Sequence, residues 1–337
     1  MFDFIPTEYF LLLFGFILLI KGGDWFVDAA SSIAARFHLP ELLIGATVVS
    51  IGTTLPEVMT SAMGAMGGHG EVAYGNAIGS IICNTALIAA LTIAIKPAGA
   101  KRRTLIFPVC FFFGVAAFYS FTAYVFGEFS RWVGIALLLL FVAYMVINVY
   151  NMKKNPEENE KEREELNTPE LPVSKGLVLR DALVLLVSAL VIAVGAYLLV
   201  ESATAIAESL KVPKTVISLT IVALGTSLPE LVTAITALRK GHGALSLGNI
   251  IGANIFNLVL VSGAAITINP FPVPGAATFF GLNTSFVFDI PLMFTVMGLM
   301  TIPTLFTGKL KRWQGVTLLA LYAAYCTLQF VLIPMFP

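Results

Sequence analysis

A helix of about 20 apolar residues is long enough to cross the hydrocarbon core of a bilayer. This chain contains a succession of such runs, separated by short polar breaks. Only 12% of its 337 residues are charged, which is about half of the fraction found in soluble domains. We therefore predict an all-α polytopic membrane protein. The ten predicted spans are residues 8–29, 41–66, 72–95, 104–126, 132–150, 178–200, 214–238, 244–267, 285–306 and 313–334.

Lys and Arg are distributed unevenly between alternate connections. With ten spans, 17 of the 20 basic residues fall in or beside one set of connections. The other set holds only Arg131, Lys211 and Lys214. Because cytoplasmic connections carry an excess of Lys and Arg, the first set is predicted to be cytoplasmic and both termini extracytoplasmic. The long hydrophilic segment, residues 151–177, then becomes a cytoplasmic linker.

The chain contains an internal repeat. Shifting it by 173 residues aligns Gly22–Asn84 with Gly195–Asn257 without a gap, and 24 of the 63 aligned positions are identical. We divide the chain into a first repeat of five spans, residues 1–150 with its motif at 50–84, and a second repeat, residues 178–337 with its motif at 223–257. Since each repeat has an odd number of spans, the second enters the membrane from the opposite side. Inverted repeats of this kind are typical of secondary transporters.

Each repeat keeps a glutamate beside a proline within an apolar span. In the first copy, "GTTLPE", Pro56 lacks an N–H, so we expect a kink or break in the helix that exposes carbonyl oxygens. Thr53 and Glu57 are four residues apart and share a helix face, with Thr54 adjacent. The second copy, "GTSLPE", supplies the equivalent groups Thr226, Ser227, Pro229 and Glu230.

A second stretch of each motif adds hydroxyl and amide oxygens. "GNAIGSIICN" places Ser80 and Asn84 on one helix face, and "GNIIGANIFN" places Asn257 at the position equivalent to Asn84. Brought together, the two repeats would offer a site made only of oxygen ligands, which suits hard cations such as Ca²⁺ or Na⁺. An ionised side chain within a membrane span costs about 2.5–3.5 kcal/mol on insertion scales. A bound cation would offset that cost.

Such a site indicates a transporter that exchanges one cation for another. An empty site with two negative charges is disfavoured from moving through the membrane, whereas a site filled by Ca²⁺, by Na⁺ or by protons can move. The inverted repeat favours a carrier, although a cation channel could use the same oxygen ligands. The chain has no H-E-x-x-H motif, nucleophile elbow or phosphate-binding loop, and we expect neither an enzyme nor a resident cofactor.

The motifs "GTTLPE" with "GNAIGSIICN" and "GTSLPE" with "GNIIGANIFN" resemble the alpha-repeats of the calcium/cation antiporter superfamily. The match is closest to the prokaryotic sodium/calcium exchangers, including the bacterial inner-membrane calcium/sodium antiporter branch. The resemblance implies a ten-span protein of the prokaryotic plasma membrane that exchanges Ca²⁺ for Na⁺ by alternating access. Its partners would be these ions and the lipid bilayer, without nucleic acid, and the sequence carries no signal for an oligomeric state.

The resemblance also implies a set of ligands. Glu57 and Glu230, with the hydroxyls of Thr53 and Thr226, would form a central calcium site. Flanking sodium sites would use Thr54, Ser227, Ser80 and the carbonyls of Ser50 and Ala223.

The chain departs from the family pattern at two positions. Well-described archaeal members carry an aspartate and a serine where this chain has Asn257 and Ala253. The site thus has two carboxylates instead of three. Proton-coupled exchange and potassium-dependent exchange therefore remain alternatives to coupling by sodium alone.

Overall fold

The structure is a computed structural model that describes residues 7–37, 39–97, 99–154, 172–209, 223–274 and 278–329. The first half contains α1 (Thr7–Arg36), α2 (Glu41–Ile44), the π-helical segment η1 (Gly45–Val49), α3 (Ser50–Met66), α4 (Gly70–Cys83), the π-helical segment η2 (Asn84–Ala89), α5 (Ala90–Ile95), α6 (Arg102–Phe126) and α7 (Arg131–Lys154). The second half contains α9 (Lys175–Ser209), α11 (Ala223–Gly225), α12 (Leu228–Arg239), α13 (Gly243–Phe256), the π-helical segment η4 (Asn257–Val261), α14 (Ser262–Ile268), the π-helical segment η5 (Ser285–Asp289), α15 (Ile290–Thr307) and α16 (Arg312–Thr327). Two short antiparallel strand pairs join β1 (Glu128–Phe129) to β2 (Phe271–Pro272), and β3 (Thr278–Phe279) to β4 (Leu282–Asn283).

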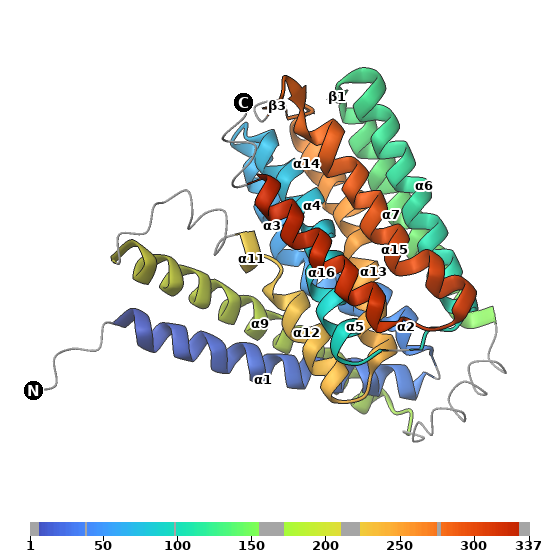
Figure 1. The fold of residues 1–337 in the computed structure, drawn as a ribbon. Helices are drawn as coiled ribbons and strands as arrows, with labels where there is room; N and C mark the ends of the chain where they lie inside the picture. Colours follow the sequence, from blue (N-terminus) through green and yellow to red (C-terminus); the bar gives the residue numbers. More distant parts are fainter. Residues whose placement is uncertain are drawn as a thin grey trace, which may run out of the picture.

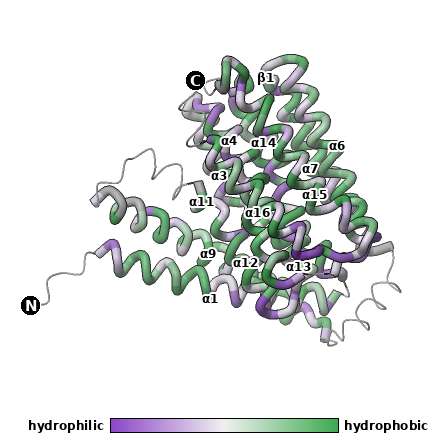
Figure 2. Tube along the Cα trace, in the orientation of Figure 1, coloured by the Kyte–Doolittle hydropathy of each residue, from purple (hydrophilic) through white to green (hydrophobic). Residues whose placement is uncertain are grey.

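Helices account for nearly all of the described chain, and the predicted all-α multi-pass fold is confirmed. Within the described part of the chain, eight helices are long and apolar enough to cross a membrane, and they match eight of the ten predicted spans. The other two, predicted at 214–238 and 313–334, lie partly outside the described residues. The described part of the first contains α11 and α12, and that of the second contains α16. The linker prediction, residues 151–177, also lies largely outside them. Apolar residues run along the helices and hydrophilic residues collect at the turns (Figure 2).

The first helix of each repeat, α1 and α9, lie side by side and reach out from the bundle formed by the other helices (Figure 1). Their backbones touch at glycines: a Cβ added to Gly15 would lie 2.9 Å from the carbonyl oxygen of Gly195, and one added to Gly22 would lie 2.9 Å from the side chain of Ile192. As the residue number rises along α1, from Gly15 to Gly22, the number of the contacted residue falls along α9, from Gly195 to Ile192. The pair is therefore antiparallel, as an inverted repeat requires.

A buried ion pair joins α1 to α9 near the other end of their contact. The Nε atom of Arg36 lies 2.6 Å from a carboxylate oxygen of Asp181, and both side chains are at most 5% exposed. The Arg36 guanidinium also donates to the carbonyl of Pro172. Because removing one partner of a buried pair leaves an uncompensated charge, this contact holds α1 and α9 together.

Candidate cation-binding site

The two glutamates occupy different local structures, although their motifs are nearly identical. We expected a kink or break at Pro56, and α3 continues through that residue, so the helix does not break there. One proline removes one backbone hydrogen bond, and helices packed inside a membrane protein tolerate that loss. In the second copy the helix does break: α11 ends at Gly225, and α12 begins at Leu228 with Pro229 in its first turn. A proline is favourable there because the first-turn N–H has no helical partner.

Both carboxylates are fully buried. Glu57 and Glu230 are 0% exposed, and among the described residues none forms a hydrogen bond with any of their four carboxylate oxygens. The two groups are close enough for their charges to interact. Thr53 lies near the Glu230 carboxylate, which brings α3 of the first repeat against α12 of the second. Two carboxyl groups therefore lie near one another in a site shielded from solvent.

Four more predicted residues carry buried polar atoms without a hydrogen-bond partner among the described residues. Thr54 and Ser227 precede the glutamates in each motif, and Asn84 and Asn257 come from the second stretch of each motif. All four are at most 2% exposed, and none of their side-chain oxygen or amide nitrogen atoms has a hydrogen-bond partner in the described part of the chain. An unsatisfied buried polar atom costs about 1–3 kcal/mol. The concentration of such atoms here indicates a site shaped for something other than protein.

Asn84 and Asn257 each begin a π-helical segment, η2 and η4. A π-turn is wider than an α-turn and occurs frequently at functional sites. The two turns occupy equivalent positions in the two repeats, 173 residues apart. The sequence analysis missed them, and the asparagine at the end of each repeated stretch was the available signal of a local irregularity.

Ser50 and Thr53 are held by a residue that the sequence analysis did not assign to the site. The hydroxyl of Ser50 lies 2.9 Å from the carbonyl oxygen of Asn249, and the hydroxyl of Thr53 donates to the Asn249 Oδ1 at 3.2 Å. Asn76, the equivalent of Asn249 in the first repeat, donates to the backbone carbonyl of Glu57 at 3.0 Å. Both asparagines lie in the repeated "GN" dipeptide, which was the available signal.

The remaining predicted residues lie on α4 and in the segment around α11. Ser80 is 5% exposed on α4, and Thr226 is half-buried in the turn between α11 and α12. Ala223 begins α11 and has no described side chain. Ala253, where the resemblance led us to expect a hydroxyl, is fully buried on α13.

The chemistry of these donor atoms suits hard cations. The available ligands are carboxylate, hydroxyl, amide and carbonyl oxygens, which suit Ca²⁺ and Na⁺. The described residues include no group of three His, Cys, Asp or Glu side chains that could hold a metal ion, so within the described part of the chain an ion here would meet at most two carboxylates. Two buried like charges are relieved when a cation lies between them.

Close packing beside the site depends on Gly252. A Cβ added there would lie 2.3 Å from the Ser50 Oγ and 2.6 Å from the Cα of Ala46. We expect Gly252→Ala to force α13 away from η1 and α3 and to lower the free energy of unfolding by about 1–3 kcal/mol, the usual range for overpacking. Thermal unfolding of the purified protein measures this. Gly114→Ala is the control, since a Cβ there meets no heavy atom of the described residues within 4 Å. Equal melting temperatures for both variants would contradict the packing described.

Comparison with known proteins gives consistent matches. The family model described as "Sodium/calcium exchanger protein" matches residues 7–150 and 181–331. The sodium/calcium exchanger MaX1 of Methanosarcina acetivorans is 30% identical over 97% of this chain and 99% of its own length. The inner membrane protein YrbG of Escherichia coli is 37% identical over 77% of this chain and 79% of its own. A solved structure of the sodium-calcium exchanger NCX_Mj has a TM-score of 0.79 and 30% identity, covering 96% of this chain and 98% of that one.

Proposed function

Because this chain belongs to the sodium/calcium exchanger family, we propose that it is a secondary-active antiporter exchanging Ca²⁺ for Na⁺ across a prokaryotic plasma membrane. One observation carries the proposal. The two repeats together bury two carboxylates and four further polar side chains whose atoms have no partner among the described residues. A cation bound among them would satisfy these groups and neutralise the charge.

We assign the central Ca²⁺ to Glu57 and Glu230, with the hydroxyls of Thr53 and Thr226. The Thr53 hydroxyl donates its hydrogen to Asn249, which leaves its lone pairs free to ligate a cation. Asn249 is therefore a positioning residue in this assignment. The flanking Na⁺ ligands are Thr54, Ser227, Ser80 and the carbonyls of Ser50 and Ala223, and the amide oxygens of Asn84 and Asn257 complete the shell.

Alternating access follows from the charge of the site. Moving two unpaired carboxylates through a low-dielectric barrier is costly, so the empty site stays in place and the filled site moves. In the proposed arrangement, residues 1–150 and 178–337 form the two inverted repeats, and the hydrophilic linker and most Lys and Arg residues face the cytoplasm. Both termini then lie on the extracytoplasmic side.

Calcium flux in proteoliposomes tests the proposal. The purified protein is reconstituted, the vesicles are loaded with Na⁺, and Ca²⁺ uptake is followed after dilution into sodium-free buffer. We expect an outward Na⁺ gradient to drive uptake, whereas proton and potassium gradients of the same size do not. The experiment with a proton gradient is needed because two buried carboxylates can also carry protons. Flux that is indifferent to every counter-ion would overturn the antiporter assignment and favour a channel.

A further inference from the structure

A carboxylate separate from the two glutamates lies within the last two spans. Asp289 ends the π-helical segment η5, directly before α15, and is half-buried. It is the only acidic residue in the described parts of these spans, residues 285–307 and 312–329. The corresponding span of the first repeat, α6, carries no acidic residue, so Asp289 is not part of the duplicated motif. Because an ionisable side chain inside a membrane span is costly, its presence there usually reflects a function.

Two neutral donors hold the Asp289 carboxylate. The hydroxyl of Tyr325 donates to its Oδ1 at 2.9 Å, and the Nε2 of Gln329 donates to the same atom at 2.8 Å. Both donors come from the end of α16 and the residues that follow it. Because both bonds end on one oxygen and neither donor is charged, these donors leave Oδ2 free and the negative charge uncompensated.

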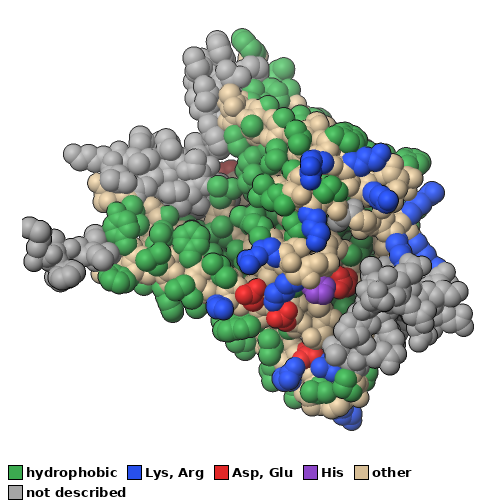
Figure 3. Space-filling view, turned by 60° about the horizontal axis from the view of Figure 1, so that its bottom comes forward, with side chains coloured by type: hydrophobic (Ala, Val, Ile, Leu, Met, Phe, Trp, Pro, Cys, Tyr) green, Lys and Arg blue, Asp and Glu red, His purple; other side chains and the backbone are tan. Residues whose placement is uncertain are grey.

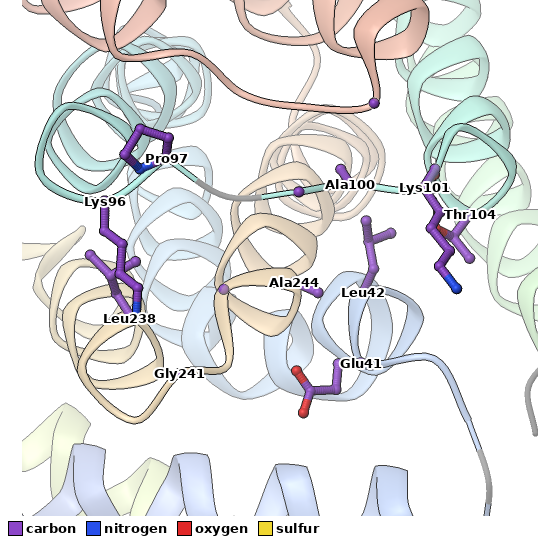
Figure 4. A pocket seen from close by; sticks show the side chains of 13 residues that line it. Glu41, Leu42, Lys96, Pro97, Ala100, Lys101, Thr104, Leu238, Gly241 and Ala244 are labelled. Carbon is purple, nitrogen blue, oxygen red and sulfur yellow. Dashed lines mark hydrogen bonds between the residues drawn. The ribbon is translucent and has the colours of Figure 1, made fainter. Parts of the chain in front are cut away.

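The basic side chains of the bundle gather at the other end of α15. Lys and Arg recur over the face of the molecule that Figure 3 shows, and Lys96 and Lys101 line a pocket there (Figure 4). Gly308, which follows α15, lines the same pocket. The 18 residues of α15 separate Asp289 from that end of the helix by about 27 Å. Among the described residues, the Lys and Arg ion pairs involve carboxylates other than Asp289.

Two buried hydroxyls complete a group of oxygens at Asp289. Ser285 lies four residues earlier in η5, is 3% exposed, and donates to the carbonyl of Pro274 at 3.1 Å, so its oxygen lone pairs remain available. Tyr74 of α4 is 4% exposed, and its hydroxyl has no hydrogen-bond partner among the described residues. That hydroxyl lies near Ser285 and within electrostatic range of the Asp289 carboxylate. A buried hydroxyl without a partner, beside a carboxylate without a counter-charge, indicates a place for a cation.

The chemistry of this group suits a small monovalent cation. Its donors are one carboxylate and three hydroxyl oxygens, and such oxygen ligands bind hard cations. A monovalent ion neutralises the single negative charge, whereas a divalent ion would leave an excess positive charge within the membrane span. The three elements that supply the donors are η5, α4 and α16. Like η2 and η4, η5 is a π-helical segment, which is a frequent feature of functional sites.

We propose that a sodium ion binds at this end of the bundle, with Asp289, Ser285, Tyr74 and Tyr325 as its ligands. The site is separate from the one proposed for the transported ions. Its occupant joins η5, α4 and α16, and α16 also packs against η2, the π-helical segment that begins at Asn84. Sodium bound here therefore stabilises the arrangement of helices around the central site without being one of the ions that are carried.

Thermal unfolding of the full chain in detergent tests the proposal in the Glu57→Gln Glu230→Gln background, which lacks both carboxylates of the central site. In mildly alkaline buffer, sodium chloride is expected to raise the melting temperature by several degrees over choline chloride at equal ionic strength. Equal melting temperatures in the two salts would overturn the sodium site. Because the central carboxylates are absent, the result does not depend on whether the protein exchanges Ca²⁺ for Na⁺.

Three further variants in that background localise the effect. Asp289→Asn keeps an oxygen that can accept both observed hydrogen bonds but removes the charge, and is expected to lose the sodium shift. Tyr74→Phe removes a hydroxyl without a partner among the described residues, and is expected to reduce the shift without destabilising the sodium-free protein. Tyr119→Phe makes the same change at another fully buried, unpartnered hydroxyl, which lies near Ser262 instead, and is the matched control that keeps the shift. A sodium shift that persists in Asp289→Asn, or that falls equally in both tyrosine variants, would show that these residues do not form the site.

Discussion

Glu57→Gln is expected to abolish calcium transport and to weaken calcium binding while making the ion-free protein more stable. Glutamine keeps the size of the side chain and removes its charge. At a separation of about 4 Å and an effective dielectric constant of about 20, two unit charges interact by about 4 kcal/mol, and Ca²⁺ carries two. Because about 1.4 kcal/mol changes an affinity tenfold, we expect binding to weaken by at least about 100-fold. Glu230→Gln is expected to behave in the same way.

The expected gain in stability distinguishes a specific loss of calcium binding from misfolding of the variant. Glu57 and Glu230 are fully buried without hydrogen-bond partners among the described residues, and replacing an uncompensated buried charge with a neutral group lowers its burial cost. The ion-free melting temperature should therefore rise, whereas the increase caused by Ca²⁺ should disappear. Glu71→Gln makes the same chemical change at a side chain that is 63% exposed and serves as control. Sodium-driven calcium uptake that survives in Glu57→Gln would contradict the assigned site.

The fold was predictable because lipid imposes a simple rule on the sequence. A spanning helix must be apolar over a length fixed by the bilayer, so the spans predicted at 41–66 and 285–306 agree with the observed helices within one residue. The ends of α1 and α9 were harder to predict. Both helices continue past the predicted spans, and the ion pair between Arg36 and Asp181 joins residues 145 positions apart. Local sequence carries no record of that pairing.

The two glutamates of the site were predictable from their chemistry and from their occurrence in both repeats. A carboxylate in an apolar span is costly, and its duplication at Glu57 and Glu230 pointed to function. The structure buries both and brings α3 against α12. The continuous helix at Pro56 was not predictable, because the helix is interrupted just before the same "LPE" triplet in the second repeat. Tertiary packing, and not the proline alone, decides whether the helix continues.

The hydrogen-bonding role of Asn249 was hidden for a different reason. An asparagine after a glycine in an apolar helix can serve packing, backbone contact or ligation. Only the observed partners, Ser50 and Thr53 on the facing helix, identify Asn249 as the residue that orients hydroxyls at the site. Asn254 shows the same ambiguity, since its amide bonds to Thr85 at 2.7 Å instead of facing the glutamates.

Asn257→Asp is expected to raise calcium affinity at least about tenfold and to destabilise the ion-free protein. Asn257 is fully buried with both amide atoms unpartnered among the described residues. An aspartate there would place a third negative charge beside Glu57 and Glu230. A bound cation gains about 4 kcal/mol per added unit charge at about 4 Å in an effective dielectric constant of about 20, part of which is offset by desolvation. Repulsion among three carboxylates lowers the ion-free melting temperature.

The same change should alter the charge moved in each transport cycle by one unit. Sodium-driven calcium uptake in proteoliposomes clamped at different membrane potentials measures this, since each elementary charge crossing the membrane contributes about 2.3 kcal/mol per 100 mV. Asn254→Asp is the matched control on α13: its Nδ2 donates to Thr85 and Met297, so the aspartate loses those bonds and gains no cation. An equal rise in calcium affinity for both variants would mean that added negative charge anywhere in the core suffices, and the special position of Asn257 would be disproved. A change in affinity and voltage dependence confined to Asn257→Asp would show that this one neutral side chain sets the charge of the transported complex.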